Sequence, residues 1–422
     1  MLINFTFENF RSFRDAAEFS MLASEEESLE CDTLLSLSDV KLLPLTAVYG
    51  GNASGKTNFV RALYELRALV CDGKVKNYMP FRLDDVSRNS PTVFTIEIAT
   101  GDEEWRYSLS IQGQQVVKES LYCLSSELSV YTRREKGLVE FDEAFFGQKS
   151  KEEIKTANDI AGTTAQSDVL LTTLHKLQGI MADFAAVASK IHAWFDDVLI
   201  IKPAWLPGIV PAVIYHTNEF SPYLRDAGTG ISDLAVESLP LRAEGNQEQV
   251  LNFIKQTIAE NETRSIGDVV LQKKEGELIS LKCVAQHVLA SGRVETFDLS
   301  EESDGTNSFI NLLPVLHNPK KTPRVFVIDE LDRSLHTKLS RKLIERHLDM
   351  ARSGVSQQLI FTTHDVMLMD KDLLRQDEVW LVDRYEDGAS ELTSYIEYEG
   401  DNDNMRQIYL QGRIGGVPSL YL

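Results

Sequence analysis

Cysteine is scarce in this chain of 422 residues. The four that occur, Cys31, Cys71, Cys123 and Cys283, are scattered along the sequence, and no Cys-x-x-Cys pair is present. Neither a cysteine-rich zinc site nor a disulfide framework is therefore expected. Reduced and partly buried thiols are the simpler interpretation.

Long apolar runs are also missing. No run reaches the roughly 18 residues that a membrane-spanning helix requires. Glu8 and Arg11 fall where a signal peptide would have its apolar core. We therefore expect a cytoplasmic protein that has no membrane partner.

Positive charge is in deficit. The chain has 43 Lys and Arg residues against 64 Asp and Glu residues, a net charge of −21 at pH 7. This acidity argues against a broadly basic nucleic-acid surface and leaves any contact with DNA to local patches. Small basic clusters occur at Arg133-Arg134, Lys273-Lys274 and Lys320-Lys321. Without aromatic interleaving, each cluster is more simply a solvated surface than a DNA contact.

The strongest positive signal is the segment 50–57, GGNASGKT. It fits the phosphate-binding loop pattern, in which two glycines bracket four residues and Lys and Thr follow. Residues 45–49 before it predict a buried strand, and residues 58–70 after it predict a helix with one apolar face. This context indicates that backbone N–H groups and a helix N-terminus surround a phosphate.

In such a loop, Lys56 is expected to reach the β- and γ-phosphates of ATP, and Thr57 to hold Mg²⁺. The residues expected to bind the nucleotide here are Gly50, Asn52, Ala53, Ser54, Gly55, Lys56, Thr57 and Asn58.

A second part of an ATP site is the apolar segment 324–328, which ends in Asp329 and Glu330. It predicts a parallel strand that is buried on both faces. The two acids then lie at its carboxyl end, where open α/β sheets bind ligands. We expect Asp329 to support Mg²⁺ and Glu330 to orient or deprotonate the attacking water.

A third strand is predicted over residues 358–363 and ends at His364. A histidine at this position can donate a hydrogen bond to a γ-phosphate and respond to its loss. A single histidine is more often structural. Its spacing after the acidic strand favours a catalytic role for His364 beside Glu330.

Together these motifs resemble the ABC-type ATPase heads of the Rad50, SMC and RecF kind. They are most similar to the single-head ATPases called AAA15 or AAA21, which occur in bacterial abortive-infection and phage-defence loci. The resemblance covers most of the chain. Residues 3–13 are similar to the opening strand and turn of this group, which implies that Arg11 and Ser12 lie beside the nucleotide.

Three segments of the C-terminal half resemble the same group. Residues 299–306 are similar to its signature segment, which implies that Ser303, Gly305 and Thr306 cap the γ-phosphate bound by an opposite protomer. Residues 334–336 resemble its D-loop, and residues 409–418 its tail.

The chain departs from the family pattern in two places. The signature reads Glu-Glu-Ser-Asp-Gly-Thr, where transporters have Leu-Ser-Gly-Gly-Gln. No glutamine suited to the Q-loop occurs between Tyr78 and Thr100, and Glu97 is the candidate replacement.

Four segments are expected along the chain. They are an N-terminal ATPase lobe (1–148), a helical insertion (149–200), a connecting α+β segment (201–296) and a C-terminal ATPase lobe (297–422). Alternating residues predict strands at 93–99, 105–112 and 116–124. Prolines predict an irregular link over 200–215, a helix is expected over 246–258, and a hairpin over 267–289 with its turn at Glu275-Gly276.

The helical insertion carries an apolar stripe at spacings of three and four residues. Its members are Leu170, Leu174, Leu177, Ile180, Phe184, Val187 and Ile191. Core packing is the usual reason for such a stripe, and a partner-binding face is the alternative. No heptad run is long enough for an SMC coiled coil.

The expected fold class is α/β: an ABC-type P-loop ATPase head with a mixed sheet, an antiparallel β subdomain and an inserted helical domain, and no long coiled coil.

The resemblance implies slow regulatory hydrolysis of ATP with Mg²⁺, in a homodimer or higher homo-oligomer that closes on ATP. It further implies a sensor ATPase of an anti-phage system that controls a separately encoded effector, such as a Toprim-type nuclease. PARIS-type systems with an AriA ATPase are one such arrangement. The alternative is a RecF- or Rad50-like DNA-binding ATPase in DNA repair.

Overall fold

The structure is a computed structural model of the 422-residue chain. It describes residues 1–24, 33–37, 40–133, 137–177, 181–204, 213–214, 216–241, 251, 255, 263–266, 269–398 and 404–416. The chain forms two compact units. Unit 1 comprises Met1–Pro203, Lys321–Leu331 and His347–Leu422, and unit 2 comprises Ala204–Lys320 and Asp332–Arg346. The predicted N-terminal lobe and helical insertion thus share unit 1 with most of the predicted C-terminal lobe.

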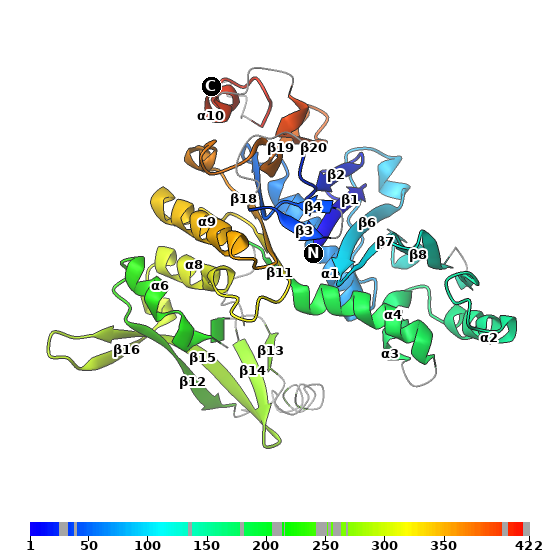
Figure 1. Ribbon diagram of the computed structural model, residues 1–422, viewed down its shortest axis with the longest axis horizontal. Helices are drawn as coiled ribbons and strands as arrows, with labels where there is room; N and C mark the ends of the chain where they lie inside the picture. Colours follow the sequence, from blue (N-terminus) through cyan, green and yellow to red (C-terminus); the bar gives the residue numbers. More distant parts are fainter. Residues whose placement is uncertain are drawn as a thin grey trace. The chain divides into compact units, whose positions relative to one another are not determined.

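A six-stranded mixed sheet forms the core of unit 1, in the order β11-β17-β18-β5-β19-β20. Figure 1 labels four of these strands, β11, β18, β19 and β20. Its strands are β5 (Leu45–Gly50), β11 (Leu199–Lys202), β17 (Arg324–Ile328), β18 (Gln357–Thr362), β19 (Val379–Arg384) and β20 (Ser390–Ser394). Neighbours are parallel except for β20, which is antiparallel to β19. Strands β5 and β18 are buried at every position, as expected of parallel strands covered on both faces.

Strand β11 corrects one prediction. The prolines of residues 200–215 predicted an irregular link, yet Leu199–Lys202 pairs in parallel with β17 and extends the core sheet. The strand ends where Pro203 begins the proline-containing stretch. Residues 205–212 and 215 of that stretch lie outside the described part of the chain.

Helix α1 (Lys56–Asp72) follows β5 directly. Its buried residues include Phe59, Leu63 and Leu66, the apolar face that the spacing predicted. The helix ends at Gly73, whose left-handed conformation (φ 75°) lets its N–H bond the carbonyl of Leu69. Helix α9 (Thr337–Arg352) precedes β18, and α10 (Met405–Leu410) follows β20.

An antiparallel sheet of seven strands forms the other β layer of unit 1, in the order β10-β9-β8-β7-β6-β1-β2. Its strands are β1 (Leu2–Glu8), β2 (Ala17–Ser20), β6 (Thr92–Thr100), β7 (Glu103–Gln112), β8 (Gln115–Cys123), β9 (Leu128–Arg133) and β10 (Val139–Phe141). The three strands predicted from alternation are β6, β7 and β8. Their turns contain Gly101 and Gly113 at positive φ. Strands β3 (Leu35–Leu37) and β4 (Val40–Leu42) form a separate pair.

The insertion is helical, as predicted. It contains α2 (Lys151–Gly162), α3 (Leu170–Lys176), α4 (Ala182–Ala193) and the π-helical turn η4 (Trp194–Val198). The apolar stripe is core: Leu174, Phe184 and Ile191 are 1%, 7% and 0% exposed. These three residues therefore pack in the core, the first of the two interpretations, whereas Leu177 and Val187 of the stripe are half-buried. Ile180 lies outside the described residues.

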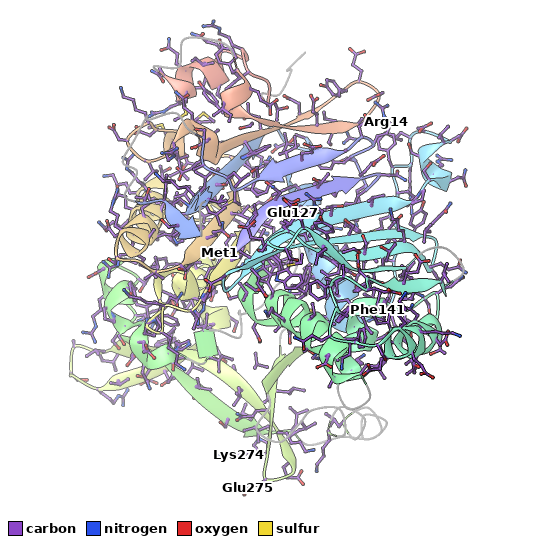
Figure 2. The ribbon with its side chains drawn as sticks, turned by 45° about the vertical axis from the view of Figure 1, so that its right-hand side comes forward. Met1, Arg14, Glu127, Phe141, Lys274 and Glu275 are labelled. Atoms are coloured by element: carbon purple, nitrogen blue, oxygen red, sulfur yellow. The ribbon has the colours of Figure 1, made fainter. Side chains whose placement is uncertain are left out.

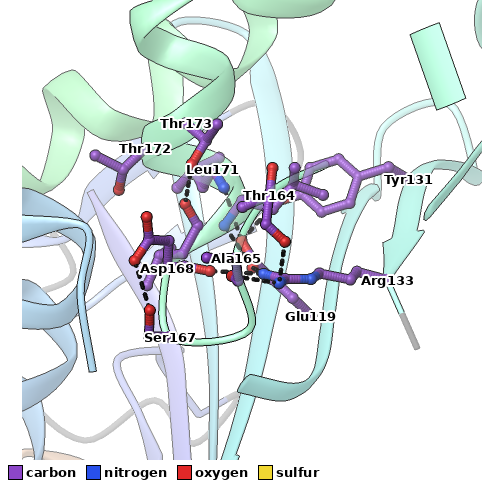
Figure 3. Close-up of polar contacts among 12 residues, drawn as sticks. Glu119, Tyr131, Arg133, Thr164, Ala165, Ser167, Asp168, Leu171, Thr172 and Thr173 are labelled. Carbon is purple, nitrogen blue, oxygen red and sulfur yellow. Dashed lines mark hydrogen bonds and ion pairs between the residues drawn. The ribbon is translucent and has the colours of Figure 1, made fainter. Parts of the chain in front are cut away.

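A buried carboxylate fixes α3 to the antiparallel sheet (Figure 3). Glu119 of β8 accepts hydrogen bonds from the backbone N–H groups of Leu170 and Leu171, both at 2.8 Å. The hydroxyls of Tyr107 and Tyr131 donate to the same carboxylate at 3.0 Å. Arg133 lies 3.8 Å from Glu119 and donates to the carbonyls of the loop before α3. Glu119 thus caps the first turn of this helix from a neighbouring element.

An antiparallel sheet of five strands dominates unit 2. Its strands are β12 (Asp233–Pro240), β13 (Thr263–Ile266), β14 (Val269–Lys274), β15 (Glu277–Val288) and β16 (Val294–Asp298). The predicted hairpin is confirmed: β14 and β15 pair, with Glu275 and Gly276 at positive φ in the turn. Figure 2 labels Lys274 and Glu275 at this turn.

The helices of unit 2 include α6 (Ser221–Asp226) and α8 (Asp304–Leu312), which continues into η8 (Leu313–Leu316). Of the helix predicted over 246–258, only Leu251 and Lys255 are described. Short 3₁₀ turns in the described part of both units include η2 (Ser87–Asn89), η5 (Thr217–Glu219), η7 (Leu299–Glu301), η9 (Val366–Leu368), η10 (Gln376–Glu378) and η11 (Tyr395–Glu397).

The thiols of Cys71, Cys123 and Cys283 are free. Cys31 lies outside the described residues. None of the described helices combines the length and the apolar character that a membrane crossing demands.

Candidate functional site

The phosphate-loop motif forms a tight turn between β5 and α1. Its two flanking glycines are required by close packing as well as by their positive φ values of 156° and 128°. A Cβ atom on Gly50 would lie 2.5 Å from the carbonyl oxygen of Val382, and one on Gly55 would lie 2.6 Å from Ser390 Oγ. Any larger residue would push the loop away from the core sheet.

Lys56 lies inside this loop and is only 6% exposed. Its ammonium group donates to the carbonyls of Gly50, at 2.8 Å, and Gly51, at 3.0 Å. A buried ammonium group inside a loop of backbone amides is suited to the phosphates of a nucleotide, where several negative charges meet. Asn52 and Ala53 are exposed at the tip of the loop, and Ser54 is buried.

The acidic strand meets the loop. Asp329 is 3% exposed and follows β17. Its Oδ1 atom accepts hydrogen bonds from Thr362 Oγ1 at 2.7 Å and from Thr57 Oγ1 at 3.4 Å. Its Oδ2 atom is buried and has no hydrogen-bond partner among the described residues.

These atoms fit Mg²⁺. The ion prefers oxygen ligands and keeps several of its waters, so a threonine hydroxyl beside a buried carboxylate suits it. The unsatisfied Oδ2 atom of Asp329 would gain a partner from the ion or from its water. Thr57 and Asp329 are therefore the residues that would hold Mg²⁺.

Glu330 and His364 lie at the same edge of the core sheet, because β17, β18 and β5 are adjacent and parallel. Glu330 has a positive φ of 55°, and its N–H donates to Thr362 Oγ1 at 2.8 Å. Its side chain is half-buried, whereas His364, two residues after β18, is exposed. The fold thus brings together both predicted catalytic residues, the loop and Asp329.

The N-terminal turn contacts the loop through Ser12. Ser12 Oγ accepts a hydrogen bond from Asn58 Nδ2 at 2.7 Å. Arg11 lies instead beside Arg61 and Glu65 of α1, and its guanidinium is 3.0 Å from the sulfur of Met79. Burial and the nearby charge of Arg61 lower the pKa of Arg11.

The hairpin of β19 and β20 also contributes to this site, a role that was not predicted from the sequence. Ser390 Oγ donates to the carbonyl of Ser54 at 2.5 Å and lies 2.8 Å from Ser12 Oγ. Arg384 donates to the carbonyl of Ala53 at 3.2 Å. The dipeptide Asp387-Gly388 between the strands is a hairpin signal that would have predicted the turn. Nothing in the sequence indicates that Ser390 supports the loop.

The C-terminal tail also approaches the loop. A Cβ atom on Gly416 would lie 3.6 Å from Gly50 Cα. Gly416 is fixed by hydrogen bonds to Asp383, at 2.5 Å, and from the Tyr409 hydroxyl, at 2.8 Å. Burial raises the pKa of Asp383. Val417 and Pro418 of the predicted tail lie outside the described residues.

The signature residues belong to unit 2. Ser303 is the N-cap of α8, and its hydroxyl accepts the N–H of Thr306 at 3.1 Å. Gly305 packs against the predicted D-loop, since a Cβ atom there would lie 2.7 Å from the carbonyl oxygen of Ser334. The signature and D-loop segments are therefore in contact within unit 2.

Glu97, the candidate for the Q-loop, is engaged elsewhere. Its carboxylate pairs with Arg106 at 2.6 Å and accepts a hydrogen bond from Asn4 at 2.6 Å, both on the antiparallel sheet. Among the described residues, Glu97 makes no contact with the phosphate loop.

A comparison with curated proteins found no match. Many solved structures are similar to the chain, and three of them are SMC heads. An SMC head bound to the C-terminal winged-helix domain of ScpA has 13% identity, covers 93% of this chain and 97% of that one, and gives a TM-score of 0.40. The SMC head domain from Thermotoga maritima has 14% identity, coverages of 93% and 98%, and a TM-score of 0.36. An SMC head with an extended coiled coil, bound to the C-terminal domain of ScpA and derived from Pyrococcus furiosus, has 12% identity, coverages of 98% and 99%, and a TM-score of 0.40.

One family model matches residues 45–165 and 186–370, well over half of the chain. The match includes the phosphate loop, Asp329, Glu330 and His364. The predicted α/β fold is confirmed, with a mixed core sheet, an antiparallel sheet and inserted helices, and no described helix exceeds the 17 residues of α1. The chain belongs to the family described as "AAA domain, putative AbiEii toxin, Type IV TA system".

Proposed function

We propose that the chain binds ATP with Mg²⁺ in unit 1 and hydrolyses it slowly as a switch. The observation that carries this proposal is the contact between the phosphate loop and the acidic strand. Thr57 and Asp329 are far apart in sequence, yet their side-chain oxygens lie 3.4 Å apart. Lys56 lies within the same loop.

Each residue has a defined part in this reaction. Lys56 and the loop amides bind the β- and γ-phosphates, and Mg²⁺, when bound to Thr57 and beside Asp329, neutralises charge on the same phosphates. Glu330 orients and deprotonates the attacking water. His364 donates a hydrogen bond to the γ-phosphate and loses that partner after hydrolysis.

The test is ATP binding by Lys56→Ala. Loss of the buried ammonium should abolish binding, because a compact positive charge is removed where phosphate charges converge. Equilibrium binding of labelled ATP is the measurement, and Lys118→Ala, which changes an exposed lysine on β8, is the matched control. Binding by Lys56→Ala at wild-type affinity would show that the loop is not the nucleotide site.

We further propose that ATP closes a homodimer in which Ser303, Gly305 and Thr306 of one protomer cap the γ-phosphate held by the other. One feature supports this arrangement. The hydroxyl of Ser303 and the amides of the first turn of α8 form a helix N-terminus, which favours an anion. In such a dimer the γ-phosphate would provide contacts that exist only in the closed state, so hydrolysis would release the dimer.

In the cell, we propose that this switch belongs to an anti-phage or abortive-infection system and controls a separately encoded effector, such as a Toprim-type nuclease. The family description, which names a toxin of a type IV toxin–antitoxin system, supports a role in a two-component locus. The test is to express the chain with its neighbouring genes and identify what co-purifies. A neighbour that is toxic when expressed alone, and that co-elutes with the chain in an ATP-dependent way, is the expected result.

DNA repair is the second candidate, in the manner of RecF or Rad50. It is favoured by one local feature: Arg61 and Arg82 both lie close enough to Arg11 for their charges to lower its pKa, with Glu65 acting in the opposite direction. Such a patch could contact DNA phosphates despite the net charge of −21. ATP-dependent affinity of the purified chain for duplex DNA, with no partner present, would support repair over defence.

A further inference from the structure

Two histidines and one glutamate converge in unit 2, apart from the residues discussed so far. They are His216, Glu219 and His317, and one ligand atom of each lies within 4.8 Å of the other two. Nδ1 of His216 is 3.2 Å from Glu219 Oε1, and Nε2 of His317 contacts Glu219 Oε2. We propose that this cluster is a binding site for one divalent transition-metal ion of the zinc class.

The donor set supports such an ion. Imidazole nitrogens with one carboxylate suit Zn²⁺ and its neighbours in the transition series, whereas Mg²⁺ and Ca²⁺ prefer oxygen ligands alone. In a tetrahedral zinc site with bonds of about 2.0–2.2 Å, ligand atoms lie roughly 3.3–3.5 Å apart. The 3.2 Å between His216 Nδ1 and Glu219 Oε1 is close to this value. Three protein ligands leave one position for water.

The surroundings also suit a metal ion. His317 is largely buried, with a side chain 13% exposed, and Glu219 is 45% exposed, so an ion can enter from solvent. The Phe220 and His317 rings pack in a T-shaped arrangement, with centroids 5.7 Å apart and planes at 88°. The histidine rings are 5.2 Å apart and inclined by 50°, so they converge on Glu219 without stacking on each other.

The site would link two parts of unit 2 that are distant in sequence. His216 directly precedes η5 and Glu219 is its last residue, whereas His317 directly follows η8 at the end of the α8 helix. The Tyr223 hydroxyl already donates to the carbonyl of Leu316 at 3.0 Å beside this position. An ion here would fix the far end of the helix that begins at Ser303, and its binding free energy would add to the stability of unit 2.

The test is the zinc content of the purified, untagged chain. The protein is treated with EDTA, dialysed against ZnCl₂ in the presence of excess Mg²⁺, and analysed by mass spectrometry of the metals. About one zinc ion per chain is expected for the wild type, and background content for His216→Ala and His317→Ala. His287→Ala is the matched control, because His287 contacts Glu302 at 2.7 Å in the same unit without a second histidine. It should retain the ion.

A second measurement separates metal binding from folding. Zinc should raise the Tm of the EDTA-treated wild type, because it binds only the folded state, and should leave that of His317→Ala unchanged. Glu219→Gln keeps the size of the side chain and should lower zinc affinity even if the histidine variants fold poorly. Lys56→Ala should retain zinc, because Lys56 lies in unit 1. Absence of zinc from the wild type, or equal zinc in Glu219→Gln and the wild type, would overturn the proposal.

Discussion

At the scale of single residues, the position of Glu330 predicts that its substitution separates ATP binding from ATP hydrolysis. Glu330→Gln keeps size and hydrogen bonding but removes the proposed base at the end of β17. ATP should still bind, while turnover falls by about 10²–10⁴-fold, the usual contribution of a positioned base. Phosphate release and ATP binding are measured together, with Glu18→Gln on β2 as an exposed control. Unchanged steady-state hydrolysis would remove Glu330 from this role.

Glu378 predicts an unusual dependence of stability on pH. It is 2% exposed, its Oε1 atom has no hydrogen-bond partner among the described residues, and burial raises its pKa to about 8. The folded state therefore retains a proton that the unfolded chain loses above its ordinary pKa of 4.5. The contribution of Glu378 to the free energy of unfolding is therefore fully present below pH 4.5 and is lost as pH rises toward 8.

Glu378→Gln should abolish this loss, since an amide does not ionise. The variant should be more stable than the wild type by roughly 1–3 kcal/mol at pH 8, and the two should converge near pH 4. Denaturant unfolding across this pH range is the measurement. A wild type that is the more stable protein at pH 8 would show that the carboxylate is ionised and well paired in the fold.

At the scale of elements, the junction of α3 with the antiparallel sheet depends on Glu119. Glu119→Gln replaces one acceptor oxygen by an N–H₂ group that faces the donors of Leu170, Leu171 and the tyrosines. A loss of about 2–4 kcal/mol in the free energy of unfolding is expected, because a buried network is left unsatisfied. Glu97→Gln is the matched control: its partner Arg106 is 48% exposed, so the change should be within about 1 kcal/mol. Equal effects of the two substitutions would contradict this role for Glu119.

Elements with a strong local signal could be predicted from sequence. Three elements show this: the phosphate loop, the strand before Asp329 and the β14–β15 hairpin. Each has an apolar segment bounded by glycine or acidic residues, and all three are present in the structure. Strand β11 could not be predicted, because the four residues before Pro203 are too few to show an alternating apolar pattern. It is held in the sheet by pairing with β17, which lies more than one hundred residues away in the sequence. The contacts of Ser390 and the convergence of His216 with His317 also depend on tertiary folding, which no local pattern reports.

At the scale of the whole molecule, the proposed dimer makes a prediction about mixtures. Ser303→Arg should bind ATP, but its dimer should not close and ATP should not be hydrolysed, because a bulky cation replaces the N-cap hydroxyl of α8. Lys56→Ala should be inactive for lack of ATP. In a mixed dimer, one site combines the intact Lys56 of one chain with the intact Ser303 of the other. Each mixed dimer should therefore recover one working site.

Phosphate release by the equimolar mixture is the measurement, at roughly a quarter of wild-type activity if the chains pair at random in twofold dimers. Ser303→Ala separates the loss of the helix cap from the steric block, and ATP binding by Ser303→Arg verifies that unit 1 is folded. Normal hydrolysis by Ser303→Arg alone, or no recovery on mixing, would refute a composite site.

The strand order of the core sheet has a consequence for synthesis on the ribosome. Strand β5 is buried at all six positions, yet its neighbours β18 and β19 begin only at Gln357 and Val379. Nascent chains therefore carry the apolar strand and the phosphate loop for most of translation without either partner. Closure of the sheet must wait until the last strands emerge, and such late long-range pairing is slow and exposes unpaired edges. Chains released before Val379 should aggregate, and productive folding should depend on chaperones that shield β5 in the meantime.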